Sequence, residues 1–192
     1  MNLKSLVATC VCAFSIAAPF ANAQEQNRWP GLSDAVVLVI RHAEKPDSGD
    51  GLTPAGKQRA QAYVKYFEPF NDGKESFNVD ALYATSDTSK SARPKLTLEP
   101  LSEAIGVPID SRFGNYDGDF LVESLRKQKH GKHALIAWHH GHIPDLLRSL
   151  GADPTKLLPN GKWPATTYDW VIELKYDKNS KLLSSQRIQE TL

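Results

Sequence analysis

Apolar residues fall into short blocks along the chain, and the spacing inside each block predicts strands separated by helices. Continuous apolar runs at 36–40 and 134–138 are typical of strands that are buried on both faces of a sheet, and a third short strand is predicted at 79–84. Apolar residues three or four positions apart predict amphipathic helices, which we place at 53–67, 96–105, 120–129 and 144–150.

Capping and turn residues support the same division of the chain. Thr53 and Pro54 are typical of a helix start, whereas Gly106 and Gly151 are typical of helix ends. Near the C-terminus, alternating residues at 168–176 and 182–188 predict two strands joined by a turn at 177–180. Strands that alternate with helices predict an α/β domain, which we expect to be a three-layer α/β/α sandwich with a mostly parallel sheet.

The first 23 residues have a different character and predict a secretory signal peptide. A basic residue near the start is followed by an apolar run at 6–20 and by the small residues Ala21 and Ala23, so cleavage is expected before Gln24. The run is too short to span a bilayer comfortably. We therefore expect a periplasmic or secreted protein with no membrane contact after cleavage, and a single domain at 24–192.

Composition narrows the picture further. The chain has 192 residues, 41% of them hydrophobic, and a net charge of +1 with acids and bases mixed along it. This suits one compact domain and gives no basic stripe for nucleic acid, which is therefore not an expected partner. Both cysteines, Cys10 and Cys12, lie inside the predicted signal, so the mature chain is expected to contain no disulfide and no thiolate ligand.

Basic side chains follow two of the predicted strands directly. Arg41 and His42 come after the strand at 36–40, and His139 and His140 come after the strand at 134–138. The carboxyl ends of strands are where open α/β sheets bind ligands. An imidazole can act as a nucleophile and a guanidinium grips phosphate oxygens with paired donors, so the pattern favours an anion site.

Clustered histidines also suggest a metal site, which is the competing interpretation. His139, His140 and His142 lack the four-residue spacing of a helical zinc pair, and nearby arginines favour an anion over a cation. We therefore expect neither a metal nor another cofactor.

Several motifs in order resemble the histidine phosphatase superfamily. Arg41-His42 is similar to its Arg-His-Gly signature, with Ala43 in place of the usual glycine. The segments 52–60, 82–86 and 97–101 resemble further family motifs, and Arg93 matches the family's second phosphate-binding arginine. The resemblance spans about 36–151 and implies the phosphoglycerate mutase-like fold, of the small branch 1 type.

The resemblance implies roles for individual residues. His42 would form a phosphohistidine, and Arg41 and Arg93 would bind the phosphoryl oxygens. A second pocket histidine is expected after the strand at 134–138. Counting back from Ile143 without a gap favours His139, while relatives that have Trp-Glu-His at this place favour His140, which we prefer.

The same resemblance calls for an acid that protonates the leaving alcohol. Glu44 in the first motif is one candidate. Asp117, in the polar loop 114–119, is another, with Asp119 close by.

The expected function is hydrolysis of phosphate monoesters on a small phosphorylated substrate by an exported phosphatase. A phosphomutase is less favoured, because the chain lacks an evident counterpart of the long substrate-clamping segments of the mutases. A non-catalytic periplasmic protein that binds or senses a phosphorylated ligand is the alternative from another class. Its support is the pair Trp138-His139, where relatives often have a small residue.

Overall fold

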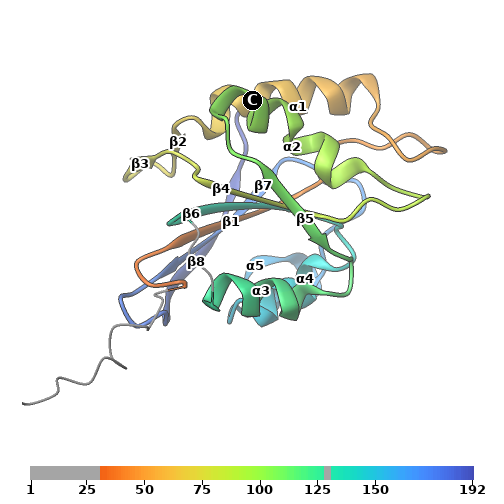
Figure 1. The fold of residues 1–192 in the computed structure, drawn as a ribbon. Helices are drawn as coiled ribbons and strands as arrows, with labels where there is room; N and C mark the ends of the chain where they lie inside the picture. The colour runs from red at the N-terminus through yellow and green to blue at the C-terminus, as the bar shows by residue number, and fades with distance from the viewer. Residues whose placement is uncertain (1–30, 128–130) are drawn as a thin grey trace, which may run out of the picture.

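The central feature of the fold is a six-stranded sheet with helices on both faces (Figure 1). The computed structural model describes residues 31–127 and 131–192. Strands lie in the order β5-β4-β6-β1-β7-β8. Four of them run parallel, namely β1 (Val36–Arg41), β4 (Ala81–Thr85), β5 (Ile109–Phe113) and β6 (His133–Trp138). Antiparallel pairs add β7 (Trp170–Tyr176) and β8 (Leu182–Gln189), so the predicted mostly parallel α/β sandwich is confirmed.

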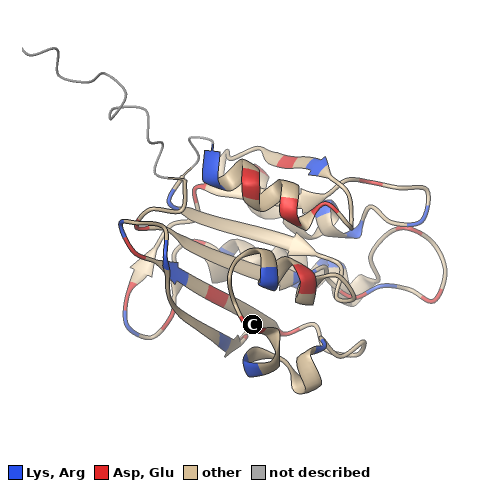
Figure 2. Ribbon diagram, turned by 90° about the horizontal axis from the view of Figure 1, so that it is seen from below, with Lys and Arg blue, Asp and Glu red and all other residues tan. Residues whose placement is uncertain are grey.

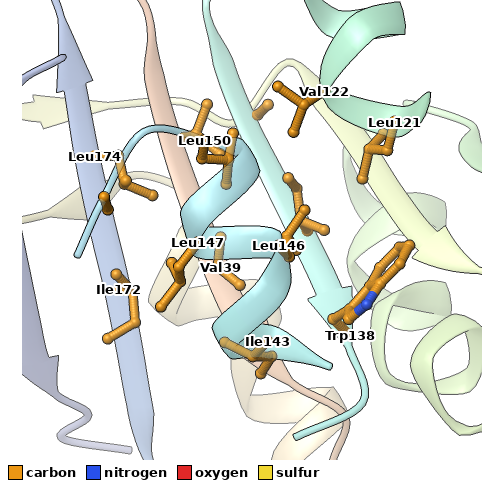
Figure 3. Packing of buried hydrophobic residues seen from close by; sticks show 14 of the residues in the cluster. Val39, Leu121, Val122, Trp138, Ile143, Leu146, Leu147, Leu150, Ile172 and Leu174 are labelled. Carbon is orange, nitrogen blue, oxygen red and sulfur yellow. The ribbon is translucent and has the colours of Figure 1, made fainter. Parts of the chain in front are cut away.

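Each face of the sheet has its own layer of helices and its own apolar core. Figure 1 shows α1 (Pro54–Phe67) and α2 (Arg93–Ile105) on one face. The other face carries α3 (Gly118–Lys127), α4 (Ile143–Ser149) and the short α5 (Pro154–Leu157). Figure 3 shows how the second core forms, with apolar side chains of α4 packed over those of β1 and β7, including Leu146, Leu147, Val39, Ile172 and Leu174. Burial on both faces explains why the β1 and β6 sequences are continuously apolar.

The predicted signals at the helix ends are present in the structure. The Thr53 hydroxyl accepts a hydrogen bond from the Gly56 N–H at 3.0 Å, which caps α1. Gly106 ends α2 in the left-handed conformation, with φ of 69° and its N–H donated to the Ser102 carbonyl.

Some elements were not predicted from the sequence. The edge strand β5 is only partly buried and its sequence, Ile-Asp-Ser-Arg-Phe, lacks an apolar run. The two-residue strands β2 (Phe70–Asn71) and β3 (Ser76–Phe77) form a small separate hairpin, and a 3₁₀ turn, η2 (Pro159–Gly161), follows α5. These segments are too short or too polar for hydrophobic periodicity to reveal.

The predicted signal peptide lies outside the described residues. Within 31–127 and 131–192, the structure has no helix of the length and apolarity needed to cross a membrane. Figure 2 shows Lys and Arg interspersed with Asp and Glu over the helices and loops, in keeping with the near-zero net charge.

Candidate active site

The parallel pairing of β1 and β6 places two histidines side by side. Arg41 pairs with Trp138 at the carboxyl ends of the two strands, and the next residues are His42 and His139. The His42 N–H donates to the Trp138 carbonyl at 3.0 Å. The two imidazole centroids are 5.0 Å apart in an edge-to-face arrangement. The structure thus brings together histidines that are nearly one hundred positions apart in the sequence.

The His42 ring is held by the backbone that follows it. Its Nδ1 lies 2.7 Å from the Ala43 carbonyl oxygen, and only 1% of the residue is exposed. With Nδ1 protonated and donating to that oxygen, Nε2 keeps its lone pair. Burial, with smaller contributions from His139, Arg41 and Arg93, lowers the pKa of His42 to about 3. A neutral imidazole with one free nitrogen is the form that a nucleophile requires.

A short hydrogen-bond chain links α2 to residues 42–44, which we call the nucleophile segment because His42 is the candidate nucleophile. The Ala43 N–H donates to the Thr97 hydroxyl at 2.8 Å, and this hydroxyl donates to the Arg93 carbonyl at 2.8 Å. Thr97 is fully buried. The first turn of α2, which carries Arg93, is therefore fixed relative to His42.

Arg41 is a fully buried arginine whose guanidinium is only partly satisfied by the protein. Its Nη1 donates to the Ala165 carbonyl at 2.6 Å and to the Thr167 carbonyl at 3.0 Å. The guanidinium carbon lies 3.7 Å from the centroid of the Tyr168 ring, a stacked cation–π contact. Nε and Nη2 are buried and have no hydrogen-bond partner among the described residues. Buried donors without partners cost about 1–3 kcal/mol each, so an oxyanion that accepts from them would be bound strongly.

Arg93 offers a second set of donors. Its Nη1 donates to the Gly49 carbonyl at 3.0 Å, and its buried Nε finds no acceptor in the part of the chain that the structure describes. Burial lowers the pKa of Arg93. Burial is also the main cause that lowers the pKa of Arg41, and the positive charge of Arg93 contributes to that shift. The two guanidinium groups are thus close enough to repel each other, and an anion between them would relieve that repulsion.

His139 and His140 occupy different surroundings. His139 contacts His42, and burial lowers its pKa to about 4, with Arg93 as the next cause. His140 lines a neighbouring cavity, and its pKa is lowered by burial and then by Arg41 and Lys45. The geometry therefore favours His139 as the second imidazole of the site, whereas the sequence led us to prefer His140.

The three acids considered from the sequence are hydrogen-bonded to groups other than the two histidines. The Glu44 carboxylate accepts from Arg59 Nε at 3.0 and 3.1 Å and from Arg59 Nη2 at 2.9 Å. Asp117 accepts from the Gly114 N–H at 2.8 Å and so closes the loop before α3, while Asp119 accepts from the Ser149 hydroxyl at 3.2 Å. Donors of Arg59 therefore occupy both oxygens of the Glu44 carboxylate.

Two side chains of the site were not singled out as functional from the sequence. Tyr168 stacks on Arg41, and its ring centroid is 6.3 Å from that of His42. Thr97 joins the segments that carry His42 and Arg93. Tyr168 lies at the start of a predicted strand and shows no local pattern that distinguishes it from a packing residue. Thr97 begins the segment 97–101, which resembles a family motif, but the motif assigned it no role.

Comparison with solved structures places the fold in a known class. No family model and no curated protein matches the sequence. The protein histidine phosphatase SixA complexed with tungstate is similar at a TM-score of 0.53 and 14% identity, over 80% of this chain and 96% of that one. The putative phosphohistidine phosphatase SixA from Agrobacterium tumefaciens has a TM-score of 0.50 and 19% identity, over 79% of this chain and 97% of that one. A phosphoglycerate mutase from Plasmodium falciparum has a TM-score of 0.51 and 16% identity, over 83% of this chain and 91% of that one.

These structures define the class to which the fold belongs. The chain has the phosphoglycerate mutase-like fold that these three solved structures share, and the fold predicted from the motifs is confirmed.

Proposed function

We propose that the protein is a phosphatase that hydrolyses phosphate monoesters through a phosphohistidine at His42. One observation carries the proposal. A buried imidazole with a low pKa faces a second imidazole, beside two arginines whose buried donors have no partner among the described residues. Solved structures with this fold include the phosphohistidine phosphatase SixA and a phosphoserine phosphatase from Entamoeba histolytica, which supports phosphoryl chemistry over simple anion binding.

The first half of the reaction follows from the positions of the donors. Phosphoryl oxygens accept hydrogen bonds from Arg41 Nε and Nη2 and from Arg93 Nε, while His139 lies against the attacking ring. The lone pair on His42 Nε2 attacks phosphorus, and the bond from phosphorus to the leaving oxygen breaks. The positive charge that develops on the His42 ring is stabilised through Nδ1–H and the Ala43 carbonyl. Positioning and fixed positive charge supply most of the rate enhancement.

The second half restores the enzyme. The leaving oxygen takes a proton from a carboxylic acid, for which Asp117 is a better candidate than Glu44, because Arg59 binds the Glu44 carboxylate. The carboxylate left by this transfer then takes a proton from water as the water attacks phosphorus. The bond from nitrogen to phosphorus breaks, and inorganic phosphate leaves with the free imidazole and the carboxylic acid restored.

The same proposal includes export to the periplasm or beyond the cell. Its support is the pattern of the first 23 residues, with a basic start, an apolar run and small residues before Gln24. N-terminal sequencing of the protein recovered from a bacterial host tests it. A mature chain that begins at Gln24 is expected, and an intact Met1 start in the cytoplasmic fraction would contradict export.

The chemistry is tested with His42→Ala and an artificial aryl phosphate. We expect wild-type turnover to fall at least a thousandfold in the variant, since covalent catalysis depends on this one nitrogen. Brief incubation with a ³²P-labelled ester should label the wild type in an acid-labile form and leave His42→Ala unlabelled. His133→Gln, which changes a histidine at the start of β6 and away from the site, is the matched control. Equal turnover in wild type and His42→Ala would reject the mechanism.

A further inference from the structure

A cavity beside the histidine motif at 139–142 is not used by the reaction described above. It has a volume of about 440 Å³, and its wall includes His140, the residue directly after His139. The lining also includes Lys162 and Trp163, which lead into the loop whose carbonyls bind Arg41. The cavity is thus built from the two chain segments that also shape the phosphate site.

The wall is held in place by local interactions. Asn160 has φ of 51° and Gly161 has φ of 70°, so the turn before Lys162 consists of two left-handed residues. The Trp163 indole N–H donates to the Thr167 carbonyl at 2.9 Å, and only 3% of Trp163 is exposed. A non-glycine residue held in the left-handed region is uncommon, and such strain is concentrated at functional sites.

Hydrogen-bond donors outnumber acceptors among the side chains that line this cavity. Lys162 contributes an ammonium group that makes no ion pair within the described part of the chain. Arg148 donates through Nη1 to Asp145, which is the one carboxylate in the wall, and keeps its other donors. The cavity therefore carries a net positive charge of about one even when His140 is neutral. A sugar hydroxyl both donates and accepts, whereas a carboxylate or phosphate at neutral pH only accepts, so the lining favours an anionic group.

We propose that this cavity binds a second anionic group, a carboxylate or a phosphate, on the leaving-group side of the substrate. This inference rests on the proposed function and narrows its substrate class to phosphate monoesters with two anionic ends. One end binds between Arg41 and Arg93, where it reacts with His42. The other lies against Lys162 and the free donors of Arg148, in the cavity that His140 also lines.

Paired substrates that differ only by the second anionic group test the inference. Phosphoserine and phosphoethanolamine differ by a carboxylate, whereas fructose 1,6-bisphosphate and fructose 6-phosphate differ by a phosphate. We expect the wild type to show a kcat/KM about tenfold higher for the doubly anionic member of at least one pair, which corresponds to about 1.4 kcal/mol. The pair that shows the preference identifies the kind of anion.

Lys162→Met retains the length of the side chain and removes its charge. In this variant the ratio of kcat/KM for the doubly anionic ester to kcat/KM for its partner should fall to about one, mainly through a higher KM for the doubly anionic ester. Lys178→Met, in the exposed turn between β7 and β8, is the matched control and should keep the wild-type preference. An active enzyme with no preference in either pair, or a preference that survives Lys162→Met, would overturn the subsite alone. An enzyme that is active on the aryl phosphate but hydrolyses none of the four esters would also overturn the subsite alone. An enzyme that hydrolyses none of the five would overturn the proposed function and the subsite with it.

Discussion

At the residue scale, the site depends on arginines that are shared between the protein and an anion. Arg41 uses one terminal nitrogen to bind backbone carbonyls and leaves Nε and Nη2 for a ligand. A lysine has a single charged nitrogen and cannot do both. The Arg41 side chain therefore supports the loop at 164–167, and in the proposed function it also binds the phosphate.

Arg41→Lys is accordingly expected to be far more damaging than its retained charge suggests. We expect kcat/KM for an aryl phosphate to fall about a hundredfold or more, because bidentate donation and the stacking on Tyr168 are both lost. Arg112→Lys changes an exposed arginine that is paired with Asp110 on β5, and it should leave kcat/KM unchanged. Steady-state kinetics on the two variants decides the point, and a loss of less than threefold in Arg41→Lys would contradict this role.

The two histidines of the site are expected to stay neutral in mild acid. Burial lowers the pKa of His42 to about 3 and that of His139 to about 4, so protonation, which would remove the nucleophile, begins only below about pH 5. NMR titration of ring-labelled histidine, assigned by comparison with His42→Ala and His139→Ala, measures this directly. We expect neither resonance to titrate between pH 5 and pH 8, and a midpoint near 6.5 for His42 would show that its ring is accessible to water.

At the scale of secondary structure, α1 packs closely against the nucleophile segment. A Cβ added at Gly56, in the first turn of α1, would lie 2.5 Å from the Glu44 carbonyl oxygen, which also accepts the Thr53 N–H at 2.9 Å. The glycine is therefore required by a close backbone approach. The segment that follows His42 can reach its position only because this turn has no side chain.

Gly56→Ala should disturb both stability and activity. We expect the free energy of unfolding to fall by about 1–3 kcal/mol, the usual cost of overpacking, and kcat to fall as the segment is displaced. Urea denaturation together with aryl phosphate turnover measures the two effects. Gly51→Ala is the control, because its added Cβ would lie 4.0 Å from Leu96 at ordinary contact distance. Equal stability of Gly56→Ala and wild type would show that the two segments move apart at little cost.

Comparison of sequence and structure at this scale shows what local patterns can reveal. Capped helices and buried strands were predicted, because Thr53, Gly106 and the apolar runs of β1 and β6 act through nearby residues. The tendency of α/β sheets to bind ligands at the carboxyl ends of their strands also identified Arg41 and His42 as candidates. The placement of His139 beside His42 depends on strand register, and the stacking of Tyr168 on Arg41 depends on a loop that returns from a distant part of the chain. Neither is encoded in residue spacing.

At the scale of the whole molecule, the C-terminal end of the described fold is tied to the nucleophile segment. Arg59 on α1 donates to Glu44 through Nε and Nη2, and to Glu190 through Nη1 at 2.5 Å. Glu190 follows β8, is only 7% exposed and accepts the Tyr63 hydroxyl at 2.9 Å. The ion-pair chain therefore joins the end of the last strand to a residue two positions from His42.

The buried carboxyl of Glu190 should make stability depend on pH in an identifiable way. Burial raises its pKa from 4.5 to about 7 despite the opposing effect of Arg59, so between these values the folded chain binds the proton that the unfolded chain has released. Stability from this group is thus complete below about pH 4.5 and declines as pH rises to about 7. His42 and His139 act in the opposite direction, because their lowered pKa values make the folded state gain stability as pH rises towards 6.5.

Glu190→Gln separates these opposing contributions, because the amide does not titrate while both histidines remain. Each pKa unit corresponds to 1.36 kcal/mol. Between pH 4.5 and pH 7.5, the free energy of unfolding of the wild type should therefore fall by up to about 3 kcal/mol relative to that of the variant. Urea unfolding of the two proteins at both pH values gives the difference directly. If this difference stays constant with pH, the Glu190 carboxyl is already ionised in the folded state at pH 4.5. The Arg59 ion pair would then outweigh burial, and the link between the last strand and the nucleophile segment would be charged throughout the range in which the enzyme is expected to work.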